Sequence, residues 1–301
     1  MCGIDGQTPT FEFTFEGLQR ALANWQIDYP EVVQPPIGYS VLGQPLQLFK
    51  VGTGHIHLHM NAAMHANEWL TAFALIAWGR RWTEQWQTFF PEYTLWLVPL
   101  VNPDGVQLVM SGSLADPACM AKVRAMNGES MDFSNWKANA RGVDLNDQFP
   151  AGWRDEYVRR SEEREACGQT YAPGARDYCG VEPLSEPEAV ALVEFVRRQS
   201  FSTVIALHSQ GEEIYWNYRG FEPDGAELMA QTMAAASGYR AVRLAESDAG
   251  FKDWFIEQFR KPGFTIELGY GQNPLPVEQL ATICDKLEHI LFAFLSNEKH
   301  D

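Results

Sequence analysis

The chain has 301 residues, of which 46% are hydrophobic and 13% aromatic, enough to bury the core of one large domain. Its 39 acidic and 23 basic residues give a formal net charge of −16, which argues against binding to the phosphate backbone of a nucleic acid. The sequence has neither an apolar run long enough to span a membrane nor a signal peptide, so we expect a soluble, cytoplasmic protein without membrane partners.

Helical and strand patterns alternate along the first third of the chain. Residues 14–30 have the periodicity of a helix, residues 55–62 alternate as a strand does, and residues 66–82 are helical again. A second strand is expected at 92–101, and the sequence Asn-Pro-Asp-Gly at 102–105 indicates a tight turn at its end.

The last third continues the alternation. Ser185 and Glu188 form a capping box ahead of a helix, and residues 202–208 form a strand that is apolar on both faces. A helix at 225–238 ends at a glycine, and residues 264–271 form another strand. The pattern predicts an α/β protein with a layered α/β/α sandwich as its architecture.

No repeat or linker divides the chain, so we expect one domain over residues 1–301, with an N-terminal helix and lead-in at 1–35. Residues 111–183 have little periodicity and are expected to form long loops over the site. The five cysteines show no C-x-x-C spacing, which favours free thiols, although Cys167 and Cys179 could pair in an oxidising compartment.

Three side chains match the ligand set of a catalytic zinc ion. His65 and Glu68 stand at the end of a strand and in the first turn of the next helix, and His208 closes another strand. Two histidines and one carboxylate leave a fourth position for water. The pair His65 and Glu68 alone is equally compatible with a capping glutamate beside a buried histidine.

His55, His57 and His59 alternate along one strand face, but no carboxylate stands at a matching spacing, and we interpret them as packing or surface residues. Glu267 lies within an apolar strand, where a carboxylate must line a cavity or meet a partner such as an arginine. It is the candidate general base of a hydrolase.

In order along the chain stand His65-x-x-Glu68, NPDG, NARGVDLN (139–146), His208-Ser209 and TIELG around Glu267. This series resembles the carboxypeptidase A-like family of zinc peptidases. The resemblance implies a mixed sheet of about eight strands, one zinc ion held by His65, Glu68 and His208, and Glu267 as general base and then acid. It also implies a cation for the oxyanion, which falls on Lys137, with Arg141 as the alternative.

Two positions depart from that family. Peptide-trimming members have asparagine followed by arginine as a clamp for the substrate carboxylate, whereas this chain has Asn146 followed by Asp147. An anion there repels a carboxylate and favours an ammonium. The mobile tyrosine of the family falls near Phe255 or Ile256.

The stretches WKANARGVDLNDQFPA and LHSQGEEIYW resemble a bacterial branch of the family, the γ-D-glutamyl-L-diamino acid endopeptidase I type. This resemblance implies cleavage of the bond between γ-D-glutamate and meso-diaminopimelate or lysine in peptidoglycan stem peptides. We expect Asn146, Asp147, Ser209 and Glu212 to contact substrate, although a solvated turn is an equally good interpretation of Glu212. The alternatives are an ordinary metallocarboxypeptidase, a zinc amidase or deacylase of small N-acyl amino acids, and a non-catalytic sensor of peptidoglycan fragments.

Overall fold

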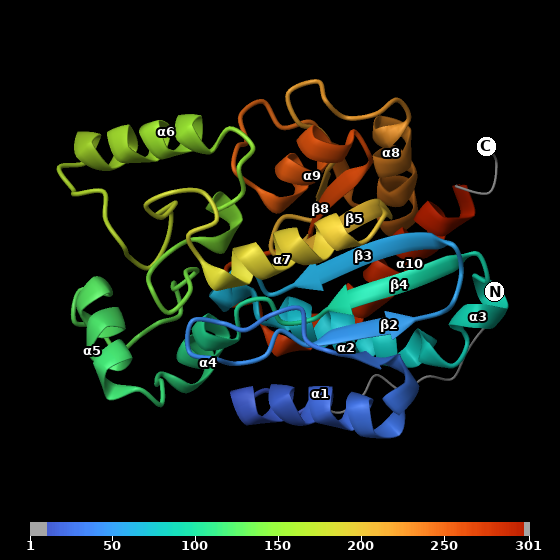
Figure 1. The fold of residues 1–301 in the computed structure, drawn as a ribbon, viewed down its shortest axis with the longest axis horizontal. Coiled ribbons are helices and arrows are strands. Elements are labelled where there is room, and N and C mark those ends of the chain that lie inside the picture. Colours follow the sequence, from blue (N-terminus) through green and yellow to red (C-terminus); the bar gives the residue numbers. More distant parts are fainter. Residues whose placement is uncertain (1–10, 298–301) are drawn as a thin grey trace.

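A mixed sheet of eight strands crosses the middle of the molecule (Figure 1). The computed structural model describes residues 11–297. The strand order is β1-β2-β4-β3-β5-β8-β6-β7, with β3 parallel to both β4 and β5, and β5 parallel to β8. The strands are β1 (Val33–Gln34), β2 (Leu48–Val51), β3 (Ile56–Ala62), β4 (Tyr93–Val98), β5 (Phe201–His208), β6 (Glu213–Tyr215), β7 (Arg240–Val242) and β8 (Gly263–Glu267).

Helices cover both faces of the sheet. They are α1 (Phe15–Asp28), α2 (Leu70–Thr83), α3 (Trp86–Phe89), α4 (Pro103–Ser111), α5 (Pro117–Met126), α6 (Trp153–Ala166), α7 (Pro187–Arg198), α8 (Ala226–Ser237), α9 (Phe251–Phe259) and α10 (Leu280–Asn297). Residues of α1, α2, α8 and α10 pack in one core cluster, and residues of α7 and α9 pack in a second. The expected α/β/α sandwich is confirmed. Among the helices of residues 11–297, none combines the length and apolar character that a membrane crossing requires.

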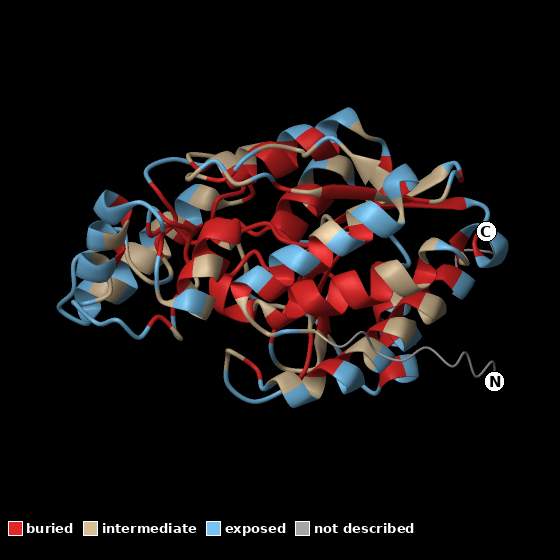
Figure 2. Ribbon diagram, turned by 90° about the horizontal axis from the view of Figure 1, so that it is seen from below, coloured by how far each residue is buried: buried red, intermediate tan, exposed pale blue. Residues whose placement is uncertain are grey.

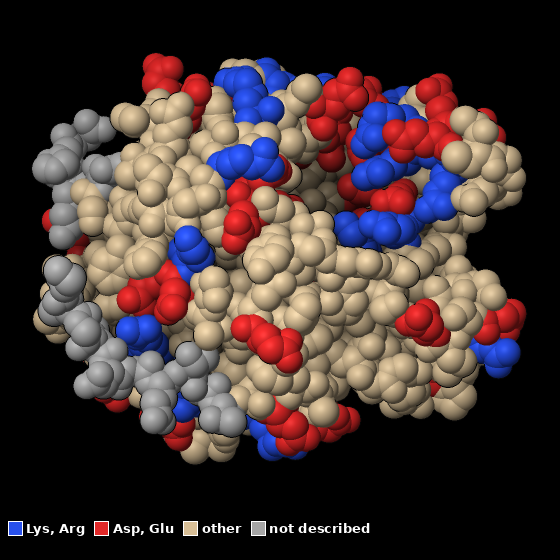
Figure 3. Space-filling view, turned by 180° about the vertical axis from the view of Figure 1, so that it is seen from behind, with Lys and Arg blue, Asp and Glu red and all other residues tan. Residues whose placement is uncertain are grey.

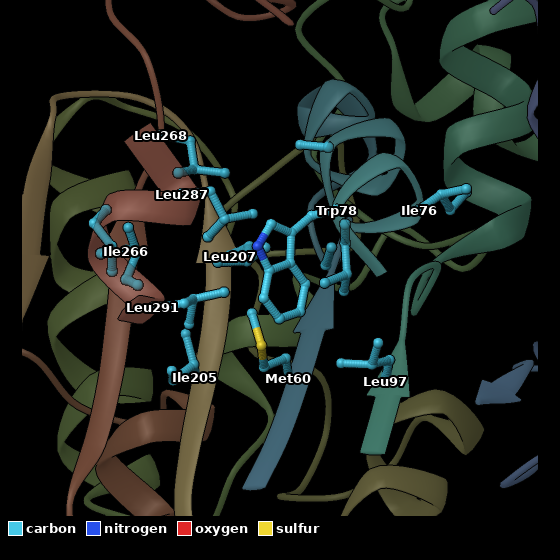
Figure 4. Packing of buried hydrophobic residues seen from close by; sticks show 14 of the residues in the cluster. Met60, Ile76, Trp78, Leu97, Ile205, Leu207, Ile266, Leu268, Leu287 and Leu291 are labelled. Carbon is cyan, nitrogen blue, oxygen red and sulfur yellow. The ribbon is translucent and has the colours of Figure 1, made fainter. Parts of the chain in front are cut away.

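The larger core lies between the sheet and helices α2 and α10. Trp78 of α2 lies among side chains from the strands of the sheet, including Met60 and Leu207, and Leu291 of α10 lies in the same cluster (Figure 4). The buried residues form a continuous interior and the outward helix faces are exposed (Figure 2). This core fixes the positions of β3, β5 and β8, from which the site is built.

Most predicted elements are present, and their ends follow from local chemistry. Helix α1 begins after Thr14, whose hydroxyl accepts a hydrogen bond from the Gly17 amide at 3.0 Å. Helix α8 ends at Gly238, which has a φ of 79°, a conformation that glycine adopts without strain.

The prediction of a tight turn at residues 102–105 was wrong, because these residues begin helix α4. The Asn102 side chain caps the helix by accepting from the Gly105 amide at 3.0 Å, and Pro103 takes the first helical position. A Cβ atom on Gly105 would stand 2.6 Å from the carbonyl oxygen of Ala138, so only glycine allows this helix to approach that loop.

The capping box predicted at Ser185 and Glu188 was also wrong. Helix α7 begins after Glu186 without a side-chain cap, and the Ser185 hydroxyl donates to Gln148 and Glu186 instead. The Glu188 carboxylate accepts from the Val41 amide at 3.0 Å. Hydrogen bonds to residues distant in the sequence, Gln148 and Val41, therefore replace the local capping bonds that the pattern predicted.

Residues 111–183 contain two helices, which the prediction of long loops missed. The side chain of Asp116 caps α5 by accepting from the Ala118 amide. Helix α6 lacks an apolar stripe and is stabilised by ion pairs one turn apart, such as Arg160 Nε to Glu156 at 2.7 Å. Charged residues at helical spacing carry no periodic hydrophobic signal, so the pattern was not visible.

The four cysteines of the described residues are free thiols, as expected. Cys179 is buried whereas Cys167 is exposed, and the two are not paired. Cys2 lies outside the described residues.

Candidate active site

The candidate metal ligands come together at one edge of the sheet. In the register, Ala62 of β3 pairs with Leu207 of β5, and His208 pairs with Glu267 of β8, so the carboxyl ends of three parallel strands meet. His65 follows β3 by three residues, and Glu68 ends a short 3₁₀ turn (Ala66–Glu68) before α2.

The ligand atoms of His65, Glu68 and His208 lie within 4.8 Å of one another, and all three side chains are buried. Nδ1 of His65 is 2.8 Å from Glu68 Oε1, and Nδ1 of His208 is 3.1 Å from Glu68 Oε2. The two Nδ1 atoms are 3.2 Å apart. Ligands about 2.1 Å from one tetrahedral ion stand about 3.4 Å apart, so this arrangement fits zinc.

The charges at this group also fit a cation. Burial lowers the pKa of His65, but the carboxylates of Glu68 and Asp144 outweigh burial and raise that pKa to about 10. Burial likewise raises the pKa of Glu68, but the two histidines hold it well below its usual range. These carboxylates favour a positive charge on His65, and a bound cation would supply a positive charge at the same place.

Asp144 orients the first histidine. Its Oδ1 lies 3.1 Å from Nε2 of His65, the nitrogen that faces away from Glu68. The carboxylate is buried and also accepts from the amides of Asn146 and Asp177. A carboxylate behind a histidine ligand fixes the tautomer and the ring. Asp144 was not predicted as a site residue, although it lies within the NARGVDLN motif.

Glu267 and Lys137 both face the ligand group. Burial, and then the Glu68 carboxylate, raise the pKa of Glu267 to about 8, whereas a bound divalent cation acts in the opposite direction. Nζ of Lys137 lies 3.9 Å from Glu68 Oε1. Burial lowers the pKa of Lys137, but the Glu68 and Asp144 carboxylates outweigh burial and raise it, so the ammonium stays charged.

A cavity of about 400 Å³ opens onto these groups, a volume within the range of small-molecule sites. Figure 3 shows a hollow in this face of the molecule, with acidic and basic side chains gathered along one side. Two larger hollows, of about 660 and 690 Å³, lie away from the candidate metal ligands and contain no comparable set of groups. The cavity is lined by His65, Asn67, Glu68, Asn135, Lys137, Arg176, Ser209, Gln210, Tyr215, Glu267, Gly271, Gln272 and Asn273.

Several of these lining residues were not predicted from the sequence. Asn67 stands between the first two ligands, and its buried Oδ1 has no hydrogen-bond partner among the described residues. Asn135 and Arg176 come from irregular segments with no periodic signal. Asn273 exchanges hydrogen bonds with the predicted residue Ser209 at 2.7 and 2.9 Å, and so holds the turn after β5.

Four predicted site residues do not line this cavity. Arg141 is exposed and lies 3.6 Å from Glu186, which favours Lys137 as the cation beside the metal ligands. Asn146 accepts from the Phe251 amide, and the backbone of Glu212 pairs with Gly269 and Arg240. Asp147 is buried beside Arg160, with 3.6 Å between Oδ2 and Nη2.

Two expectations remain: the position of the family's mobile tyrosine, and the interpretation of the strand histidines as packing or surface residues. Phe255 and Ile256, where the mobile tyrosine of the family falls, are buried in α9. His59 is fully buried, and its Nδ1 is 3.0 Å from the carbonyl oxygen of Trp96. Within residues 11–297, His65, Glu68 and His208 are the group placed to hold a metal ion, so the interpretation of His59 as a packing residue is confirmed for that side chain.

Fold and site together define the class of this protein as a zinc-dependent peptidase. Residues 18–288 match the zinc carboxypeptidase (peptidase M14) family, and the chain belongs to that family.

Two relatives are similar over most of the chain. The chain is 41% identical to γ-D-glutamyl-L-diamino acid endopeptidase 1 of Lysinibacillus sphaericus, over 97% of this chain and 74% of that protein. It is 40% identical to the uncharacterized protein YqgT of Bacillus subtilis strain 168, over 89% of this chain and 73% of that protein. The fold also matches thrombin activatable fibrinolysis inhibitor with a TM-score of 0.73, at 21% identity, over 96% of this chain and 74% of that one.

Proposed function

We propose that this zinc peptidase hydrolyses the amide bond between the γ-carboxyl group of D-glutamate and the L-centre of a diamino acid, meso-diaminopimelate or lysine, in peptidoglycan stem peptides. The observation that carries the proposal is the 41% identity, over 97% of the chain, to a γ-D-glutamyl-L-diamino acid endopeptidase. The intact set of candidate metal ligands, together with Glu267, favours a working hydrolase over a non-catalytic sensor.

The residues after the NARGVDLN motif support this substrate over an ordinary peptide. Trimming carboxypeptidases are expected to clamp the free C-terminal carboxylate with an arginine, and this chain has Asp147 at that position. A carboxylate that is itself buried beside Arg160 offers no binding site for a second carboxylate. The arginine expected in the carboxylate clamp of trimming members is therefore absent at this position.

In this proposal His65, Glu68 and His208 would hold one zinc ion, and that ion would supply a Lewis acid to activate water and polarise the scissile carbonyl. The Glu267 carboxylate takes a proton from the attacking water and gives it to the departing amine. The Lys137 ammonium stabilises the negative charge that develops on the carbonyl oxygen. Asp144 keeps the His65 ring oriented through Nε2.

The direct test is incubation of the zinc-loaded protein with L-Ala-γ-D-Glu-meso-diaminopimelate, and separately with a plain peptide that ends in an aromatic residue. We expect L-Ala-D-Glu and diaminopimelate as products by mass spectrometry, with the plain peptide intact. Trimming of the plain peptide alone would instead establish an ordinary carboxypeptidase. Cleavage of small N-acyl amino acids alone would establish an amidase, and no zinc-dependent hydrolysis would favour the sensor.

A further inference from the structure

Arg176 is the arginine that lines the candidate active-site cavity, and nothing in the proposed chemistry so far uses it. It lies in an irregular segment after α6. The carbonyl oxygen of its neighbour, Ala175, accepts hydrogen bonds from the amides of Lys137 and Ala138, at 2.8 and 3.1 Å. These two bonds hold Arg176 next to Lys137, on the side of the cavity where the candidate oxyanion cation lies.

The guanidinium of Arg176 is available to a ligand. Its ion pair in the described structure joins Nε to Asp177 Oδ2 at 3.6 Å, and 45% of its side chain is exposed. The same Asp177 carboxylate also lies within 3.6 Å of Arg160 and 3.4 Å of Arg164, so one anion is shared by three guanidinium groups. The two terminal nitrogens of Arg176 thus present the planar edge that binds a carboxylate with two hydrogen bonds.

A γ-linked glutamyl residue carries a carboxylate that an ordinary peptide residue lacks. When the side-chain carboxyl forms the scissile amide, the main-chain α-carboxylate remains free, four carbon–carbon bonds or about 5 Å away. In an ordinary peptide the corresponding carboxyl is part of the next amide bond. A cation near the metal ligands therefore distinguishes, by charge, a γ-linked glutamyl residue from an ordinary residue that has no side-chain carboxylate.

We propose that Arg176 binds the α-carboxylate of the γ-linked glutamyl residue and so selects substrates joined through the γ-carboxyl group. This inference rests on the proposed function. The glutamyl carboxylate is favoured over those of the diamino acid because it is common to substrates with either diaminopimelate or lysine. The relative is named an endopeptidase, and the α-carboxyl of the diamino acid can be part of an amide bond in an endopeptidase substrate.

The test compares two substrates that differ in one group: L-Ala-γ-D-Glu-meso-diaminopimelate and its analogue with the glutamyl α-carboxylate converted to the amide. We expect the unaltered enzyme to prefer the free acid by about ten- to a hundredfold in kcat/KM, the range of one charged hydrogen-bonded contact. Arg176→Gln should lower kcat/KM for the acid to about that for the amide, with little change for the amide itself. Arg176→Lys, which keeps the charge without the planar fork, should retain part of the preference.

The matched control is Arg198→Gln, which removes one positive charge from the exposed surface of α7, where Arg198 forms an ion pair with Glu194. This control should keep the full preference for the acid. The Tm of each variant reports folding independently of activity.

Three results would overturn the inference. An equal loss of kcat on both substrates in Arg176→Gln would mean that Arg176 stabilises the oxyanion or the folded structure and does not bind the glutamyl carboxylate. An acid preference that survives in Arg176→Gln would exclude Arg176 from recognition. A preference that disappears on amidation of a diaminopimelate carboxylate instead would place the contact on the leaving residue. If the unaltered enzyme cleaves neither substrate, the proposed function itself fails, and this inference fails with it.

Discussion

Glu267→Gln separates proton transfer from metal binding at the level of a single residue. The amide keeps the shape of the side chain but cannot take a proton from water, so we expect kcat to fall by about two to four orders of magnitude. Zinc content should be unchanged, because the proposed ligands are other residues. Steady-state kinetics and metal analysis check both statements, with Glu194→Gln on the surface of α7 as the control. Appreciable remaining kcat would mean that another group is the base.

Asp147→Asn tests whether this residue recognises the ammonium of the diamino acid. Burial, and then the neighbouring Asp144, raise the pKa of Asp147, and its buried Oδ2 has no hydrogen-bond partner among the described residues. Asp147 does not line the cavity, so a substrate ammonium would provide that partner, and favour the ionised form, only by reaching past the residues that do. We expect KM for diaminopimelate-containing peptides to rise by one to two orders of magnitude, or about 1.4–2.8 kcal/mol. An unchanged KM would remove Asp147 from substrate recognition.

At the scale of elements, the capping residue of α4 also supports the site. Asn102 is buried, accepts from the Gly105 amide, and donates to the carbonyl oxygens of Met64 and Ala138, at 3.2 and 3.1 Å. It therefore joins the start of α4 to the residue before His65 and to the residue after Lys137.

We expect Asn102→Ala to lower the free energy of unfolding by about 2–4 kcal/mol, because a helix cap is lost, the Met64 carbonyl loses its side-chain donor, and the Ala138 carbonyl keeps only Trp136 Nε1 as a side-chain donor. Urea unfolding measures this loss, and zinc affinity should fall in the same variant. The control Asn127→Ala removes a half-buried asparagine that donates to the carbonyl oxygens of Ser130 and Asp132 in the loop after α5, and it should cost less than 1 kcal/mol. Equal losses in the two variants would contradict a special role for Asn102.

The elements that could be predicted are those in which apolar side chains recur with the period of a helix or a strand. His65, Glu68, His208 and Glu267 lie at the ends of such segments, so the sequence was sufficient to bring them to one edge of the sheet. Asn135 and Arg176 lie in segments without a period, and long-range bonds such as Lys137 N to Ala175 O determine where these segments run. The same limit explains the polar helix α6, which no hydrophobic stripe reveals.

The stability of the whole molecule depends on pH through buried groups that do not line the cavity. Burial lowers the pKa of His59 to about 3, so this imidazole stays neutral in the folded protein while it is protonated below about pH 6.5 in the unfolded chain. The unfolded state then binds more protons, and stability falls as the pH drops through this window. Burial of Glu188 raises its pKa to about 7, which has the opposite effect between about pH 4.5 and 7.

His59 and Glu188 change the stability in opposite directions as the pH falls. The contribution of His59 is therefore measured by comparing the unaltered protein with a variant at that position. We expect the unaltered protein to lose about 3 kcal/mol relative to His59→Gln between pH 7 and pH 4, since the variant has no imidazole to protonate. Chemical unfolding of both proteins at several pH values measures this change. A stability difference that does not vary with pH would show that the His59 pKa is not depressed.

The pairing of β3 with β5 brings together two histidines that are 143 positions apart in the chain. At a synthesis rate of about 5–20 residues per second, roughly 7 to 30 seconds pass between the addition of the first histidine and the second. Glu267 is added later still. A chain that is still on the ribosome, or that ends early, cannot assemble the proposed metal site. Hydrolytic activity is therefore withheld until His65, His208 and Glu267 have all been synthesised.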